Sequence, residues 1–282
     1  MHYLLKITRP VTSFMAALSV LIGALVIIGK DVILYIPALI LSFFTVFFIC
    51  AGGFVLNDYL DREEDRINHP ERPIPSNNIT PRRALVFSIG IFIGGLACVN
   101  FLVWFFSPLS VIVVIIGAII LVFYELSFKK IGIAGNAMVG ILVALTYIFG
   151  SFVVLPPADV LKLNTAHILA LLAFCAIMGR EIIMDIEDME GDVKRNTLPR
   201  KIGKKKSAVI ASSFLLFAIL IGPLPFFPLG MLNFYYLPFL VVGDGILLYS
   251  IFIQLQAPAL ARKTTKVALL ISSLGFIVGS MK

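Results

Sequence analysis

The sequence VILYIPALILSFFTVFFICAGGFVL at Val32–Leu56 runs directly into the sequence NDYLDREED at Asn57–Asp65. An apolar run of that length is sufficient for a helix to cross the hydrocarbon core of a bilayer. Because lipid offers no partner for backbone polar groups, such a segment must be helical. The acidic run marks the point where this helix leaves the membrane. The stretch therefore predicts a membrane-embedded helical fold with a charged cluster at its rim.

The same apolar character extends over the whole chain. Of its 282 residues, 60% are hydrophobic and 14% are charged, whereas soluble domains have about 25% charged residues. We predict an all-α integral membrane protein, multi-pass in the cell membrane, with a single domain over residues 1–282 and nine transmembrane helices. The predicted spans are Val11–Ile28, Val32–Leu56, Ala84–Phe105, Leu109–Phe128, Ile133–Leu155, Ala166–Asp185, Ala208–Phe227, Met231–Gln254 and Val267–Met281.

The basic residues are distributed unevenly among the segments that join these spans. With the N-terminus in the cytoplasm, 20 of the 23 Lys and Arg residues fall on the cytoplasmic side, which agrees with the positive-inside rule. The exceptions are Lys30, Lys162 and Lys282. This orientation places three cap segments on the cytoplasmic face, at about 57–83, 128–132 and 186–207. We expect the functional site on that face.

The first acidic cluster has a helical spacing. Asn57, Asp61 and Asp65 are separated by four residues each, and Asp58 lies three residues before Asp61. If the second span continues as a helix, these side chains share one face. Like charges at this spacing repel one another unless a cation lies between them. Carboxylate oxygens are the ligands that Mg²⁺ takes in proteins, with water and phosphate completing its shell.

A second acidic cluster repeats this spacing at the end of the sixth span. Glu181, Asp185, Asp188 and Asp192 follow one another at steps of four, three and four residues. A single cluster of this kind is equally well explained as a solvated helix end balanced by nearby arginines. Two clusters at the same membrane face favour a shared metal site, since carboxylates at the membrane boundary are costly unless they pair or bind an ion.

Basic residues beside the clusters complete a candidate anion site. Arg66 and Arg72 follow the first cluster, Lys194 follows the second, and Lys129 comes at the end of the fourth span. Divalent cations together with arginine and lysine can hold a diphosphate and stabilise the charge that develops as it leaves. Each of these residues taken alone also fits an ordinary positive-inside residue.

These clusters resemble the motifs of the UbiA superfamily of intramembrane prenyltransferases. The matching residues are Asn57, Asp58, Asp61 and Asp65 for the NDxxDxxxD motif, and Asp188 and Asp192 for the DxxxD motif. The sequences KITRP at 6–10 and REIIMDIEDMEGD at 180–192 are most similar to the archaeal digeranylgeranylglyceryl phosphate synthases. Members with aromatic acceptors have a YDxxYAxxDxxxD motif, and Arg180-Glu181 stands here in place of its Tyr-Asp.

The resemblance implies a Mg²⁺-dependent transfer of a geranylgeranyl group from geranylgeranyl diphosphate. The acceptor would be the sn-2 hydroxyl of geranylgeranylglyceryl phosphate, and the product would carry the second ether bond of archaeal membrane lipids. Two Mg²⁺ ions would lie between the clusters, with Asp65 binding directly or through water. Arg9 would hold the acceptor phosphate, because the matching stretch includes Arg9-Pro10. Glu181 or Asp185 would accept the hydroxyl proton, or the released diphosphate would do so.

Two other functions remain open at this point. The first is a prenyltransferase of quinone biosynthesis with an aromatic acceptor. The second is a cation-coupled transporter, although transporter carboxylates usually lie near the membrane midplane. The net charge of +7 is explained by the basic residues on the cytoplasmic side of the membrane. The sequence has no basic patch with interleaved aromatic residues that would indicate nucleic-acid binding. Asp244, in the middle of the eighth span between two glycines, has no assigned role.

Overall fold

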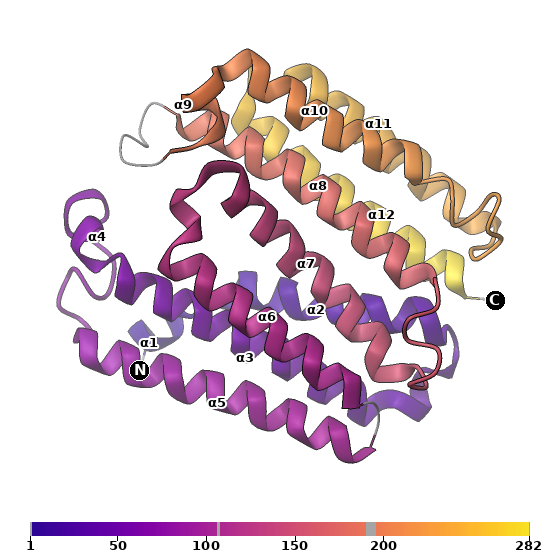
Figure 1. Ribbon diagram of the computed structural model, residues 1–282, viewed down its shortest axis with the longest axis horizontal. Coiled ribbons are helices and arrows are strands. Elements are labelled where there is room, and N and C mark those ends of the chain that lie inside the picture. Colours follow the sequence, from indigo (N-terminus) through magenta and orange to yellow (C-terminus); the bar gives the residue numbers. More distant parts are fainter. Residues whose placement is uncertain (1, 106–107, 190–195, 282) are drawn as a thin grey trace.

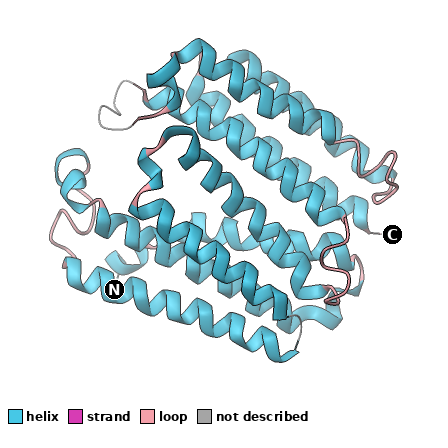
Figure 2. Ribbon diagram, in the orientation of Figure 1, coloured by secondary structure: helices cyan, strands magenta, loops and turns pink. Residues whose placement is uncertain are grey.

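The computed structural model describes residues 2–105, 108–189 and 196–281, and all regular structure in those ranges is helical (Figure 2). The short helices and turns of 3-10 helix are α1 (His2–Ile7), η1 (Asp31–Tyr35), α4 (Arg62–Asn68), η2 (Phe128–Lys130), α9 (Leu198–Ile202) and η3 (Phe234–Tyr236). The long helices are α2 (Pro10–Ile28), α3 (Ile36–Leu60), α5 (Pro81–Phe105), α6 (Pro108–Leu126), α7 (Gly132–Val154), α8 (Thr165–Asp188), α10 (Lys204–Ile221), α11 (Leu237–Ile253) and α12 (Pro258–Ser280).

Long apolar helices dominate the described residues, and seven of them are long and apolar enough to cross a membrane. The chain is therefore a multi-pass membrane protein. Helices α10 and α12 occupy the two other ranges in which we predicted spans. Both carry basic residues in their N-terminal halves: α10 begins with three lysines at 204–206, and α12 has Arg262, Lys263 and Lys266 after its first turn.

The predicted boundaries of the seventh and eighth spans were wrong. The seventh was expected to reach Phe227, but α10 ends at Ile221. Pro223 and Pro225 follow immediately, and proline lacks the N–H that a continuing helix needs. The eighth span was expected to begin at Met231, but α11 begins at Leu237 after the η3 turn.

The helices form two groups that meet along α2 and α7. Figure 1 shows α3, α5 and α6 together on one side and α8, α10, α11 and α12 on the other. Each group has its own buried apolar cluster, and residues of α2 and α7 contribute to both. Helices α2 and α7 pack closely because both have glycines at their contact. A Cβ atom on Gly150 would lie 2.0 Å from the Val20 carbonyl oxygen, and one on Gly23 would lie 2.2 Å from that of Tyr147.

The segment that follows the first acidic cluster is anchored to the helices. Ile74 and Ile79 are buried in a small apolar cluster with Ile7, Val55 and Ala84, from α1, α3 and α5. This apolar cluster holds the loop after α4, which is part of the predicted cap segment at 57–83, over the end of α3. Helices α4 and α9 lie at the same end of the molecule, at the left in Figure 1, and the C-terminus lies at the other end.

Candidate active site

The first acidic cluster lies where α3 passes into α4. Helix α3 ends at Leu60 and α4 begins at Arg62, with Asp61 between them. The backbone N–H groups of Asp61 and Asp65 still donate to the carbonyl oxygens four residues earlier, at 2.9 and 2.8 Å. The helical spacing of the cluster therefore continues through the break.

Two carboxylates of this cluster pair with arginines from other segments. Arg9 has a left-handed backbone at the start of α2, and its Nη2 donates to Asp58 Oδ1 at 2.9 Å. Arg72, from the cap segment, donates to Asp65 Oδ2 at 2.7 Å and lies 3.9 Å from Asp58. Asp58 and Asp65 are buried, so their negative charges are compensated mainly by these two guanidinium groups.

Asp61 is bound into a second set of polar contacts, which includes a residue that sequence reasoning missed. Lys129 Nζ donates to Asp61 Oδ1 at 2.5 Å and to Glu125 Oε2 at 3.3 Å. Asn57 Nδ2 donates to the same Glu125 oxygen at 2.6 Å and to Asp61 Oδ2 at 3.1 Å. Glu125 is buried in the last turn of α6, and it holds both Asn57 and Lys129 in place.

The second cluster lies on α8, where most of the residues are buried. Glu181 is paired with Arg180, the residue before it. Asp185 accepts a hydrogen bond at 2.8 Å from the side-chain amide of Asn136 on α7. Asp188, at the end of α8, is exposed. Asp192 and Lys194, which we also predicted as site residues, lie outside the described residues.

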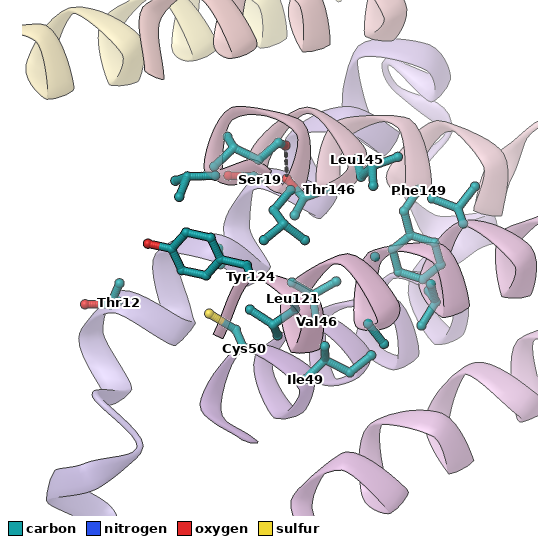
Figure 3. Close-up of a pocket in the computed structure, with 18 of the residues that line it drawn as sticks. Thr12, Ser19, Val46, Ile49, Cys50, Leu121, Tyr124, Leu145, Thr146 and Phe149 are labelled. Carbon is teal, nitrogen blue, oxygen red and sulfur yellow. Dashed lines mark hydrogen bonds between the residues drawn. The ribbon is translucent and has the colours of Figure 1, made fainter. Parts of the chain in front are cut away.

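An apolar cavity reaches from Glu125, which contacts the first cluster, to Glu181 of the second. It has a volume of about 360 Å³ and is lined by residues of α2, α3, α6, α7 and α8. Both Glu125 and Glu181 line it, and so does Phe54, over whose ring the Arg9 guanidinium lies at 4.8 Å. Figure 3 shows Thr12 and Tyr124 toward one side of the cavity and Phe149 toward the other. A volume of this size is typical of a small-molecule site.

A family model described as the UbiA prenyltransferase family matches residues 16–274. The chain belongs to the UbiA prenyltransferase family. The chain is thus a prenyltransferase.

Relatives of this UbiA family member support a narrower comparison. The digeranylgeranylglyceryl phosphate synthase of Methanosphaera stadtmanae is 34% identical over 289 residues, which cover 100% of each chain. That of Methanothrix thermoacetophila is 36% identical over 230 residues, or 81% of each chain. The expected resemblance to this group of UbiA enzymes is confirmed.

Solved structures agree with this comparison. A digeranylgeranylglyceryl phosphate synthase superposes with a TM-score of 0.83 at 32% identity, covering 99% of this chain and 98% of the other. A UbiA homologue from Archaeoglobus fulgidus bound to GPP and Mg²⁺ superposes with a TM-score of 0.69 at 17% identity. It covers 98% of this chain and 99% of the other, and at that identity it shows a shared fold.

The predicted basic residues of this UbiA protein lie in different environments. Arg72 and Lys129 contact the first cluster directly. Arg66 lies on the exposed face of α4, where it pairs with Glu63 at 2.9 Å. Arg9, predicted for the acceptor phosphate, contacts Asp58 and is therefore next to the first cluster.

Two functional candidates, Glu125 and Asn136, were not predicted. Glu125 had a visible signal, because a carboxylate in an apolar span usually has a function and Lys129 follows it by four residues. Asn136 had no comparable signal, because the sequence does not show which side chain its amide contacts. Within the described ranges, no group of three His, Cys, Asp or Glu side chains forms a ready metal site. The carboxylates of the first cluster point to basic partners instead.

Proposed function

We propose that this protein transfers a geranylgeranyl group from geranylgeranyl diphosphate to the sn-2 hydroxyl of geranylgeranylglyceryl phosphate. The observation that carries the proposal is the apolar cavity lined by Glu125 at one acidic cluster and by Glu181 at the other. A prenyl chain fits such a cavity while its diphosphate remains with the charged residues at the rim. The named relatives, which match over most of their length, support the choice of donor and acceptor.

The donor set of the two clusters fits Mg²⁺, and we propose two ions. Hard oxygen ligands are present in Asn57, Asp58, Asp61 and Asp65 of the first cluster and in Asp188 and Asp192 of the second. Bound Mg²⁺ neutralises charge on a diphosphate leaving group. In this structure Arg9, Arg72 and Lys129 neutralise the carboxylates of the first cluster, as bound cations would.

Basic residues that lie beside the first acidic cluster would bind the diphosphate oxygens. Arg72 and Lys129 are the main candidates because both already reach into the cluster, and Lys194 is a further one. Arginine and lysine held in place before the reaction stabilise developing negative charge without a large reorganisation. The bond between the prenyl carbon and the diphosphate oxygen breaks, and the diphosphate leaves with the bonding electrons.

The acceptor side of the reaction would use residues near the mouth of the cavity. The hydroxyl oxygen forms the new ether bond to the prenyl carbon, and its proton goes to Glu181, which lines the cavity. Asp185 does not line the cavity. Its hydrogen bond from Asn136 would hold α8 against α7 and so keep Glu181 in position. Arg9 is partly exposed beside the cavity residue Phe54, and we propose that it holds the acceptor phosphate.

The membrane arrangement belongs to the same proposal. Nine spans with a cytoplasmic N-terminus put both acidic clusters at the cytoplasmic face of the cell membrane. The two lipid substrates then enter from the bilayer, while diphosphate leaves to the cytoplasm. A test is cysteine labelling from each side of the membrane, with Glu63→Cys expected to react only from the cytoplasm.

The acceptor assignment is tested with purified protein, Mg²⁺ and labelled geranylgeranyl diphosphate. Geranylgeranylglyceryl phosphate, 4-hydroxybenzoate and a dihydroxynaphthoate are supplied separately. We expect product only with the glycerol phosphate. Prenylation of an aromatic ring, without product from the glycerol phosphate, would overturn the assignment and favour the quinone-type reaction.

A further inference from the structure

Helix α6 forms one wall of the cavity, and one position along that wall has no side chain. Val113, Gly117, Leu121 and Glu125 are spaced four residues apart, so they lie along one face of the helix, and all four line the cavity. Glu125 contacts the first acidic cluster, whereas Val113 is buried together with Phe149 in the apolar core. This face therefore leads from the charged rim into the molecule.

Gly117 is the point on this face where a side chain is missing. A Cβ atom there would meet no neighbouring atom within 4 Å. By contrast, a Cβ atom on Gly53 of α3 would lie 2.7 Å from the Leu121 side chain, so that glycine serves close packing. Helix packing does not require glycine at 117. What the glycine provides is open space inside the cavity.

The position of Gly117 divides the cavity along its length. An α-helix rises about 1.5 Å per residue, so Gly117 lies roughly 12 Å from Glu125 and roughly 6 Å from Val113 along α6. A side chain at 117 would occupy the cavity about two thirds of the way down from the rim. Figure 3 shows side chains of α3, α6 and α7 surrounding the same space.

We propose that Gly117 determines the longest prenyl chain that the cavity accepts, an inference that rests on the proposed function. With glycine at 117, the distal part of a twenty-carbon chain passes toward Val113 and Phe149. With a branched side chain at 117, the space on the rim side remains and the deeper part is closed. A ten-carbon chain, half as long, would still fit. Gly117 is thus a specificity-determining residue for the donor.

The test compares Gly117→Leu with Gly90→Leu. A Cβ atom on Gly90, in α5, would also meet no neighbouring atom within 4 Å, but Gly90 is exposed and does not line the cavity. Both changes replace a helical glycine with a good helix former, which should not weaken either helix. Turnover and binding of labelled geranyl and geranylgeranyl diphosphates are measured for each variant in the presence of Mg²⁺.

We expect Gly117→Leu to lower kcat/KM for geranylgeranyl diphosphate, relative to geranyl diphosphate, by at least the roughly 10–200-fold that one methylene is worth in an apolar pocket. Binding should shift in the same direction, and Gly90→Leu should leave the ratio unchanged. An unchanged ratio in Gly117→Leu, or equal loss of both donors in turnover and binding, would overturn the inference. Failure of the unsubstituted protein to use geranylgeranyl diphosphate would instead refute the proposed function.

Discussion

The two acidic clusters have almost the same spacing in the sequence but different electrostatic surroundings in the fold. In the first cluster, carboxylates meet bases from three other segments: Arg9 at the start of α2, Arg72 in the loop after α4, and Lys129 in the η2 turn. In the second, Asp185 on α8 receives a hydrogen bond from a neutral amide on α7, and the base paired with Glu181 is Arg180 of the same helix. The same carboxylate spacing thus lies in two environments.

This difference indicates a division of labour. A base beside a carboxylate stabilises its charged form, and the buried carboxylates Asp58 and Asp65 are paired with Arg9 and Arg72 from other segments. The first cluster is therefore suited to hold charge, namely cations and the diphosphate. Glu181 is paired with Arg180 of its own helix, but it lines the apolar cavity, where the acceptor hydroxyl would come within reach of it. We therefore propose that Glu181 of the second cluster takes the proton from the acceptor.

The largest expected effect comes from Asp61→Ala in the first cluster. This change removes a proposed metal ligand and also the partner of Lys129 and Asn57. The loss of a single preorganised group of this kind costs roughly 10²–10³-fold in kcat, so losing two functions should reduce turnover by at least about 10⁴-fold. Steady-state assays with geranylgeranyl diphosphate measure this loss of kcat.

Glu63→Ala is the matched control for Asp61→Ala. Glu63 is a carboxylate two residues away, but its side chain is 64% exposed and it pairs with Arg66 on the surface. Its removal should leave turnover nearly unchanged. Similar losses in both variants would mean that general negative charge, rather than the paired geometry of Asp61, matters in this segment.

Glu181→Gln tests the role assigned to the second cluster. The substitution keeps the size and polarity of the side chain but removes its ability to accept a proton. General-base catalysis contributes typically 10²–10⁴-fold, so kcat should fall by about that factor, with little change in the KM for geranylgeranyl diphosphate. Asp185→Asn should have a smaller effect because Asp185 does not line the cavity. Unchanged kcat in Glu181→Gln would assign the proton to the released diphosphate.

Glu125→Gln should have an intermediate effect, which is seen in how the reaction rate depends on the Mg²⁺ concentration. Glu125 accepts hydrogen bonds from Asn57 and Lys129 and so positions a proposed ligand and a proposed diphosphate-binding base. Loss of such a supporting partner typically costs 10–100-fold in metal affinity, so the Mg²⁺ concentration for half-maximal rate should rise by about that factor. Glu125→Asp should recover part of the loss. An effect on thermal unfolding alone, with normal Mg²⁺ dependence, would assign Glu125 a purely structural role.

Much of this fold could be predicted from the sequence because bilayer-spanning helices are specified locally. Apolar runs located the long helices, and the spacing of the first cluster predicted that helical hydrogen bonding continues from α3 into α4. The cavity could not be predicted, since five helices that are distant in the sequence form its wall. The contacts of Arg9 and Asn136 were also hidden, because they depend on how α2 and α7 pack against their neighbours. Glu125 was missed although its spacing to Lys129 was visible.

The smallest expected effect distinguishes the two arginines that follow the first cluster. Arg66 and Arg72 were both among the candidates for binding the diphosphate, but Arg66 pairs with Glu63 on the exposed side of α4, whereas Arg72 contacts Asp65. Exposed ion pairs are worth about 0.2–1 kcal/mol, so Arg66→Ala should change kcat/KM by less than about fivefold. Arg72→Ala should reduce it by at least about tenfold, because its charge is directed into the site. Equal losses in the two variants, measured with geranylgeranyl diphosphate at saturating acceptor, would mean that the cap segment rearranges and brings Arg66 to the diphosphate.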